Sequence, residues 1–199
     1  MGVFVAPGYG GRGGDSAVRA GVAIRPLVSL SVFILAMALS GCDFLVEVDA
    51  GKLAFERGKY SEAARAWEKG AREGSSSAEY GLGKLYELGL GRPQDDAIAA
   101  KYYALAAGRN HPYAQAALAM LYAYGRGVPQ DYGLSFMWSS LAAINYPRWS
   151  NADKAAALRN RDIVAARLSS VELIASQRAV EQFAETGKLG ARDSSTGKD

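Results

Sequence analysis

The sequence predicts an all-α fold, an α/α solenoid of stacked helical hairpins that is closed by a C-terminal helical cap. Three observations predict it. A segment recurs without a gap at an offset of 36 residues, apolar residues within each copy follow the helical period, and glycine and proline separate the apolar segments. The chain has 199 residues, which is enough for one such domain with a further segment at each end.

The internal repeat is the strongest of these observations. Residues 78–107 align with residues 114–143, and twelve of the 30 aligned positions are identical. Self-similarity at a fixed period is typical of solenoids, in which each repeat is one supersecondary unit. The identical pairs are Ala78/Ala114, Leu82/Leu118, Leu85/Leu121, Tyr86/Tyr122, Gly89/Gly125, Gly91/Gly127, Pro93/Pro129, Gln94/Gln130, Asp95/Asp131, Leu105/Leu141, Ala106/Ala142 and Ala107/Ala143.

Each copy predicts a helix, a glycine-rich turn and a second helix. In the first copy, Gly89 can adopt the left-handed conformation that ends many helices, and Pro93 cannot stand in a helix interior. Asp95 follows and is suited to cap the next helix. The apolar positions keep the helical period on both sides of this turn. They are Ala78, Leu82, Leu85 and Tyr86 before it, and Ala99, Tyr102, Tyr103, Ala106 and Ala107 after it.

A partial third copy, residues 49–74, precedes the full copies 78–107 and 114–143. Its turn, around Gly58, is shorter and lacks the Gly-x-Gly-x-Pro element. Residues 49–143 are therefore predicted to form three hairpins. The residues of the partial copy that stand in phase with the second helix of the full copies are Tyr60, Ala63, Trp67 and Ala71.

After the last copy the repeat stops, and residues 144–185 are predicted to cap the open end of the stack. Two helices are expected, at about 151–167 and 170–185. Their starts have capping-box spacing, Ser150 with Asp153 and Ser169 with Glu172. Terminal units of a solenoid are expected to differ from the others. The expected apolar positions are Ala155, Leu158, Ile163, Ala166, Leu173, Ile174, Ala179 and Phe183.

Two aromatic residues in the loop before these helices have two interpretations. Tyr146 and Trp149 either fill the space beneath the C-terminal helices or belong to an exposed binding patch. Residues 186–199 are rich in glycine, serine and charge, and are predicted to be a disordered tail.

The repeated residues resemble the Sel-1-like repeat, a relative of the tetratricopeptide repeat. The pattern of that family is roughly A-x-x-x-L-G-x-x-Y-x-x-G-x-G-V-x-x-D-x-x-x-A-x-x-W-Y-x-x-A-A. The resemblance covers residues 78–143 well and residues 49–74 loosely. It implies a helical solenoid that binds other proteins and catalyses nothing. The matches are Leu82-Gly83, Tyr86, Gly89, Gly91, Asp95, Ala99, Tyr102-Tyr103 and Ala106-Ala107, then Tyr122, Gly125, Gly127-Val128, Asp131, Trp138 and Ala142-Ala143, with Ala119 in place of glycine and Ser135 in place of alanine.

Residues 1–41 predict a cleaved secretory signal peptide. Residues 26–42 carry no charge, residues 27–39 are strongly apolar, and Arg19 and Arg25 precede them. A membrane-spanning helix is the alternative, but spanning needs roughly 20 apolar residues and this run is shorter. The glycine-rich stretch before Arg19 is either an extended start of the signal or lies upstream of the true translation start.

The signal ends in Leu39-Ser40-Gly41-Cys42, which resembles a bacterial lipobox. The resemblance implies cleavage after Gly41, diacylation of the Cys42 sulfur, acylation of the new N-terminus and a lipidated linker at 42–48. Two or three acyl chains anchor a protein firmly, whereas one chain is marginal. Asp43 resembles the signal that retains lipoproteins in the inner membrane. We therefore expect the protein at the periplasmic face of the inner membrane, with the outer membrane as the alternative.

The composition argues against several functions. The residues after Gly41 hold 20 of the 23 basic and 19 of the 20 acidic residues, so the mature chain is near neutral, unlike a nucleic-acid binder. One cysteine and one histidine cannot build the usual zinc or His/Cys catalytic sites. G-x-S-x-G, Walker and C-x-x-C motifs are missing. We expect no catalytic residue, cofactor or metal, and place His111, which precedes Pro112, in a connecting turn.

The expected function is that of a membrane-tethered, monomeric adaptor that binds an envelope protein or peptide. Solenoids form concave surfaces, and their first helices line them. Two alternatives remain open. One is a cell-wall module that binds peptidoglycan or polysaccharide through exposed aromatics. The other is a hydrolase like the cysteine-rich members of the family linked to β-lactams, whose paired cysteines this chain lacks. The expected partner-binding face consists of Tyr80, Lys84, Glu87, Met120, Ala123 and Tyr124.

Overall fold

The prediction of an all-α fold is confirmed in the computed structural model, which describes residues 49–187. The expected signal peptide, the lipobox with Gly41 and Cys42, Asp43 and most of the expected tail lie outside these residues. The described part contains helices and no strand. The helices are α2 (Ala50–Glu56), α3 (Tyr60–Arg72), α4 (Ser76–Leu88), α5 (Asp96–Gly108), α6 (Pro112–Tyr124), α7 (Tyr132–Asn145), α8 (Asn151–Ala165) and α9 (Ser170–Thr186).

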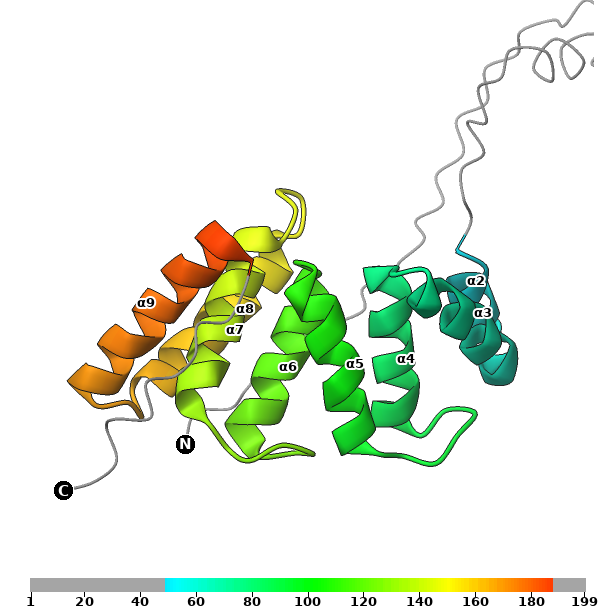
Figure 1. Cartoon of the computed structure of the whole chain (residues 1–199), viewed down its shortest axis with the longest axis horizontal. Coiled ribbons are helices and arrows are strands. Elements are labelled where there is room, and N and C mark those ends of the chain that lie inside the picture. Colours follow the sequence, from blue (N-terminus) through cyan, green and yellow to red (C-terminus); the bar gives the residue numbers. More distant parts are fainter. Residues whose placement is uncertain (1–48, 188–199) are drawn as a thin grey trace, which may run out of the picture. The chain divides into compact units, whose positions relative to one another are not determined.

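The first six helices form three successive hairpins, α2/α3, α4/α5 and α6/α7, and each helix packs on the next (Figure 1). Helix α6 begins and ends 36 residues after α4, and α7 begins 36 residues after α5. The 36-residue offset in the sequence is therefore a structural repeat. None of the helices in residues 49–187 is long and apolar enough to cross a bilayer.

The glycine-rich turns end the first helix of each full hairpin and start the second, as expected. Gly89 and Gly125 are left-handed C-caps, with φ of 65° and 66°. The carboxylate of Asp95 accepts a hydrogen bond from the Ile98 amide at 2.9 Å. Asp131 caps α7 in the same way.

The second glycine of each turn also joins neighbouring repeats. A Cβ atom on Gly127 would lie 2.2 Å from the carbonyl carbon of Asp96, at the start of α5. A Cβ atom on Gly91 would lie 2.8 Å from the Cβ of Tyr60, at the start of α3. Contacts at these distances leave no room for a side chain. Each turn therefore packs directly on the start of the preceding hairpin's second helix.

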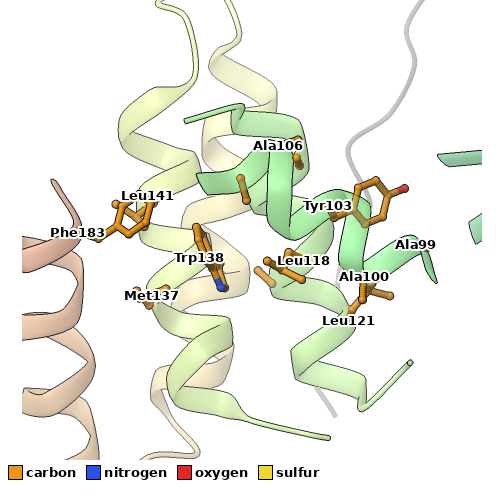
Figure 2. Packing of buried hydrophobic residues seen from close by; sticks show 13 residues of the cluster. Ala99, Ala100, Tyr103, Ala106, Leu118, Leu121, Met137, Trp138, Leu141 and Phe183 are labelled. Carbon is orange, nitrogen blue, oxygen red and sulfur yellow. The ribbon is translucent and has the colours of Figure 1, made fainter. Parts of the chain in front are cut away.

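The core lies between the first helices of the hairpins and their second helices. Trp67, Tyr103 and Trp138 are buried, as their positions in the repeat predicted. Figure 2 shows Trp138 within the largest cluster, with Leu118 of α6 on one side and Phe183 of α9 on the other. The many alanines of the cluster allow the helices to approach closely, so the core consists of a few large side chains set among small ones.

The C-terminal helices α8 and α9 cap the stack. Each of them packs mainly on α7, and they contact each other much less. The Phe183 ring of α9 meets the Trp138 ring edge to face, with centroids 5.3 Å apart. The expected apolar faces are partly wrong, because Ala166 and Ile174 are exposed. The helix residues that are buried are Ala156, Ala157, Asn160 and Val164 in α8, and Ser176 and Phe183 in α9.

One of the two predicted capping boxes is present. Ser169 accepts from the Glu172 amide, and the Glu172 carboxylate accepts from the Ser169 amide at 2.8 Å. The box at Ser150 is absent, because its side chain makes no cap hydrogen bond. Asp153 accepts instead from the hydroxyl of Tyr113 at 3.3 Å, which ties α8 to α6.

Candidate interaction surface

The expected partner-binding face lies on α4 and α6, the first helices of the two full hairpins. Tyr124 is 50% exposed at the end of α6, as the prediction requires. Ala123 is only 2% exposed, so the expectation that it faces outward is wrong. The other four residues are partly buried.

Helix α8 covers the expected face on α6. Ala123 packs in a cluster with Phe136 of α7 and Val164 of α8. The amide of Asn160, also on α8, lies 3.5 Å from the sulfur of Met120 and donates to it. The prediction placed the helix at about 151–167 in the cap of the stack but did not expect it to cover Met120 and Ala123 of α6. The open part of the surface is therefore centred on α4.

Aromatic rings surround Tyr80 on α4. Its ring stacks on His111 with centroids 4.8 Å apart, and it lies 5.7 Å from Tyr103 and 6.1 Å from Tyr113. The repeat pattern predicts Tyr80 on the binding face but does not indicate His111 and Tyr113 as its neighbours. Position 111 follows the Gly-Arg-Asn turn, and only the folded structure brings it against the preceding first helix.

The two charged residues of the expected face are held by specific contacts. The Lys84 ammonium lies 4.6 Å from the centroid of the Phe55 ring, within the range of a cation–π interaction. Glu87 accepts from the Tyr103 hydroxyl at 2.7 Å and from Arg126 at 3.3 Å. Burial and the nearby Glu87 charge raise the pKa of Tyr103 well above its ordinary value, so the phenol stays protonated and donates. Both charges are thus fixed in place on a surface that remains partly open.

His111 is a helix cap. Its Nδ1 accepts from the Ala114 amide at 3.2 Å, at the start of α6. Burial lowers the pKa of His111 to about 4, so the ring is neutral near pH 7 and can accept this hydrogen bond. In residues 49–187 no group of three or more His, Cys, Asp or Glu side chains is arranged to hold a metal ion.

The two aromatic residues between α7 and α8 differ in solvent exposure. Tyr146 is buried and meets the Tyr113 ring edge to face at 5.0 Å, so it fills the space under the C-terminal cap. Burial is the main reason that its pKa is raised, and the charge of Asp153 adds to it. Trp149 is 85% exposed. Since both residues lie outside the repeat, the sequence offered no way to tell them apart.

The stacked hairpins and their turns define an α/α repeat solenoid. The family model described as Sel1 repeat matches residues 76–111 and 112–145. The match coincides with the hairpins α4/α5 and α6/α7. A scaffold for protein–protein interaction is the role that this family suggests.

Solved structures are similar to this chain. A protective antigen present in uropathogenic Escherichia coli strains, described as displaying an SLR fold, matches with a TM-score of 0.60 and 24% identity, over 75% of this chain and 33% of that one. A Sel1 repeat protein from Oxalobacter formigenes matches with a TM-score of 0.46 and 30% identity, over 59% of this chain and 56% of that one. The chain thus spans only part of either protein. No curated protein matches the sequence.

Proposed function

We propose that the chain is a membrane-tethered, non-catalytic adaptor of the bacterial envelope, which binds a partner protein through the surface around α4. One observation carries the proposal: Tyr80, Lys84 and Glu87 form a row on α4 that neighbouring side chains hold in place while leaving it partly open. Side chains already fixed before binding lose little conformational freedom when a partner arrives. The lipobox-like residues 39–42 lie shortly before α2 and support the tether.

The experiment is capture of membrane proteins by crosslinking, with the full lipidated chain as bait. Tyr124→Ala and Tyr80→Ala should each lower recovery of the main partner, because truncating an aromatic hot spot typically costs above about 2 kcal/mol of binding. Asp162→Asn is the matched control, since Asp162 lies on exposed α8 surface with Arg161 as its partner. If all three variants recover the partner as well as the unaltered chain does, the α4 surface is not the binding site.

A second candidate is a cell-wall module, and the exposure of Trp149 favours it. An indole that is 85% exposed on a loop is available to stack on a sugar ring. Sedimentation with purified peptidoglycan tests this idea. Trp149→Ala should abolish co-sedimentation if the candidate is right. Equal sedimentation of both forms, or none by either, rejects it.

A further inference from the structure

The loop between α7 and α8 carries an exposed tryptophan on a closed turn. The Ser150 amide donates to the carbonyl of Pro147 at 2.9 Å, so Arg148 and Trp149 occupy the two central positions of the turn. Tyr146, which is buried, directly precedes the turn and holds it on the domain. Trp149 is exposed, whereas the other two tryptophans of the chain are buried. A fixed piece of backbone therefore presents this indole to the surroundings.

The exposed side chains next to this indole in the sequence are apolar or basic. Ile144, in the last turn of α7, is 62% exposed. Arg148 and Lys154 are exposed as well. Asp153 is the only acidic residue from position 144 to position 154, and its carboxylate accepts from the Tyr113 hydroxyl at 3.3 Å. The loop thus combines an indole, an aliphatic side chain and two positive charges.

This loop lies at the edge of the domain where α2 begins. From α2 to α9 the successive helices are joined by short connections and run in alternating directions (Figure 1). The start of α2 at Asp49 and the connections 73–75, 109–111 and 146–150 therefore lie at one edge, which we call the N-terminal edge. The remaining connections lie at the opposite edge, together with Val171 at the start of α9.

A lipid on Cys42 would be joined to the domain at this same edge. Residues 42–48 connect Cys42 to Asp49, and a segment of this length spans at most about 25 Å. A lipidated chain would therefore keep its N-terminal edge close to the bilayer. Tryptophan is enriched at membrane–water interfaces, because its ring is apolar while its N–H is polar. Basic side chains add electrostatic attraction to anionic lipids.

We propose that the turn 147–150 makes a second contact with the membrane, in which the Trp149 indole enters the headgroup region of an anionic bilayer. Ile144 adds apolar contact, and Arg148 and Lys154 bind lipid phosphates. This contact rests on the tether in the proposed function. The lipid holds the first hairpin and the turn holds the last, so the two contacts together fix the orientation of the domain. The α4 surface, which runs along the side of a helix and not at the edge, then remains open to a partner.

The test uses the purified, lipidated full chain in vesicles of phosphatidylethanolamine and phosphatidylglycerol, with or without bromine on the acyl chains. Because the other two tryptophans are buried, the difference in fluorescence between the unaltered chain and Trp149→Phe reports the Trp149 indole. We expect this difference signal to shift to shorter wavelength on the vesicles and to be quenched about twofold by brominated lipid. Arg148→Gln combined with Lys154→Gln should reduce the quenching to its level in neutral phosphatidylcholine vesicles.

Val171→Ala is the matched control, because it removes a side chain that is 71% exposed from the opposite edge. It should leave the Trp149 signal and its quenching unchanged. An equal loss of quenching in this variant would show that the turn has no special part in membrane contact, and would overturn the proposal.

Flotation of the vesicles reports the tether separately. A chain that floats, but whose Trp149 signal brominated lipid does not quench, overturns the second contact and leaves the tether standing. A chain that does not float overturns the contact and the tether together, and partner capture still decides whether the α4 surface binds a protein. Soluble peptidoglycan fragments are added in a second series. A shift of the Trp149 signal with these fragments, and none with the vesicles, overturns the membrane contact and assigns the indole to the cell wall.

Discussion

His111 does at the start of α6 what Ser75 does at the start of α4. The two residues are 36 positions apart, and each accepts a hydrogen bond from the backbone amide three residues later. The difference is that only the imidazole titrates. A neutral ring can accept this hydrogen bond, and a protonated ring cannot. One substitution between equivalent positions thus gives the second repeat a pH dependence at its cap that the first repeat lacks.

Stability should therefore fall as the pH is lowered from about 6.5 to 4. The pKa of His111 is about 4 in the folded chain and 6.5 as its ordinary value. Because the folded pKa is lowered, the unfolded chain takes up the proton first, and the stabilisation present above pH 6.5 is lost on the way down to pH 4. The full shift corresponds to about 3 kcal/mol, and solvent screening of this partly exposed ring reduces the expected loss to about 1–2 kcal/mol.

Urea unfolding at a series of pH values measures this loss. His111→Ser, which copies Ser75, keeps a cap acceptor and should flatten the dependence between pH 6.5 and 4. If the variant and the unaltered chain lose the same stability over this interval, His111 is not the group responsible.

Gly127→Ala should be strongly destabilising. Its φ is +66°, and its new Cβ would overlap the backbone of Asp96, which cannot move like a side chain. The left-handed conformation costs about 1 kcal/mol for alanine, and the overlap adds about 1–3 kcal/mol. Gly108→Ala is the control, since a Cβ there meets nothing within 4 Å and helix propensity favours alanine by up to about 1 kcal/mol. Thermal unfolding should separate the two variants, and equal midpoints would contradict the packing of the turn.

Where α4 packs on α5, a small residue on one helix faces a large side chain on the other. Gly83 of α4 faces the Tyr103 ring of α5, and a Cβ on it would lie 2.5 Å from two ring carbons. In the second repeat the corresponding positions hold Ala119 and Ser139. Alanine can replace the family glycine at position 119 because a serine takes the place of the large ring at the other position.

Gly83→Ala should destabilise by about 1–3 kcal/mol, because the buried Tyr103 ring is held by Glu87 and cannot give way easily. Tyr103→Ser alone should cost about 3–5 kcal/mol through loss of the ring. The double variant recreates the second repeat and should cost less than the sum by at least about 1 kcal/mol. Denaturant unfolding of the four proteins gives this coupling. Strictly additive losses would show that the ring and residue 83 do not compete for space.

At the level of elements, the sequence was most informative where the 36-residue repeat could be used. The helix starts at Asp95 and Asp131 and the ends at Gly89 and Gly125 follow from residues with one dominant local role. Ser150 shows where such reasoning fails. Its capping-box spacing is formally present, but Asp153 is bound by Tyr113, 40 residues away. A long-range partner of this kind leaves no trace in local spacing.

At the level of the whole molecule, the fold class could be predicted and the open surface only in part. A repeated hairpin must stack, because one copy cannot bury its apolar face alone. The sequence does not show which further helices pack against each side of the stack. Helix α8 lies against α6 and covers Ala123, whereas a cavity lined by Glu79 and Tyr102 lies open between α3 and α5. Both features depend on side chains from three helices at once.

The tether is tested by Cys42→Ser. If the lipobox-like residues are processed as their resemblance implies, the unaltered chain incorporates a labelled fatty acid and the variant does not, since serine lacks the sulfur that accepts the lipid. The variant should also keep its signal segment, and therefore migrate as a larger protein. Metabolic labelling followed by gel electrophoresis measures both effects. Equal label in the two forms would contradict lipidation at Cys42.

The destination of the tethered protein depends on the residue that follows Cys42. An aspartate at this position resembles the inner-membrane retention signal, so Asp43→Ser should move the protein from the inner to the outer membrane. The described domain begins only at residue 49, so we expect the substitution to leave its fold and thermal midpoint unchanged. Asp49→Ser is the matched control, because Asp49 caps α2 and accepts from the Trp67 indole at 3.1 Å; it should lower stability without changing the membrane. Sucrose-gradient fractionation of the three forms measures which membrane each one is found in. Identical distribution of the Asp43→Ser variant and the unaltered chain would show that residue 43 does not sort this protein. That result would leave the argument for lipidation at Cys42 unchanged.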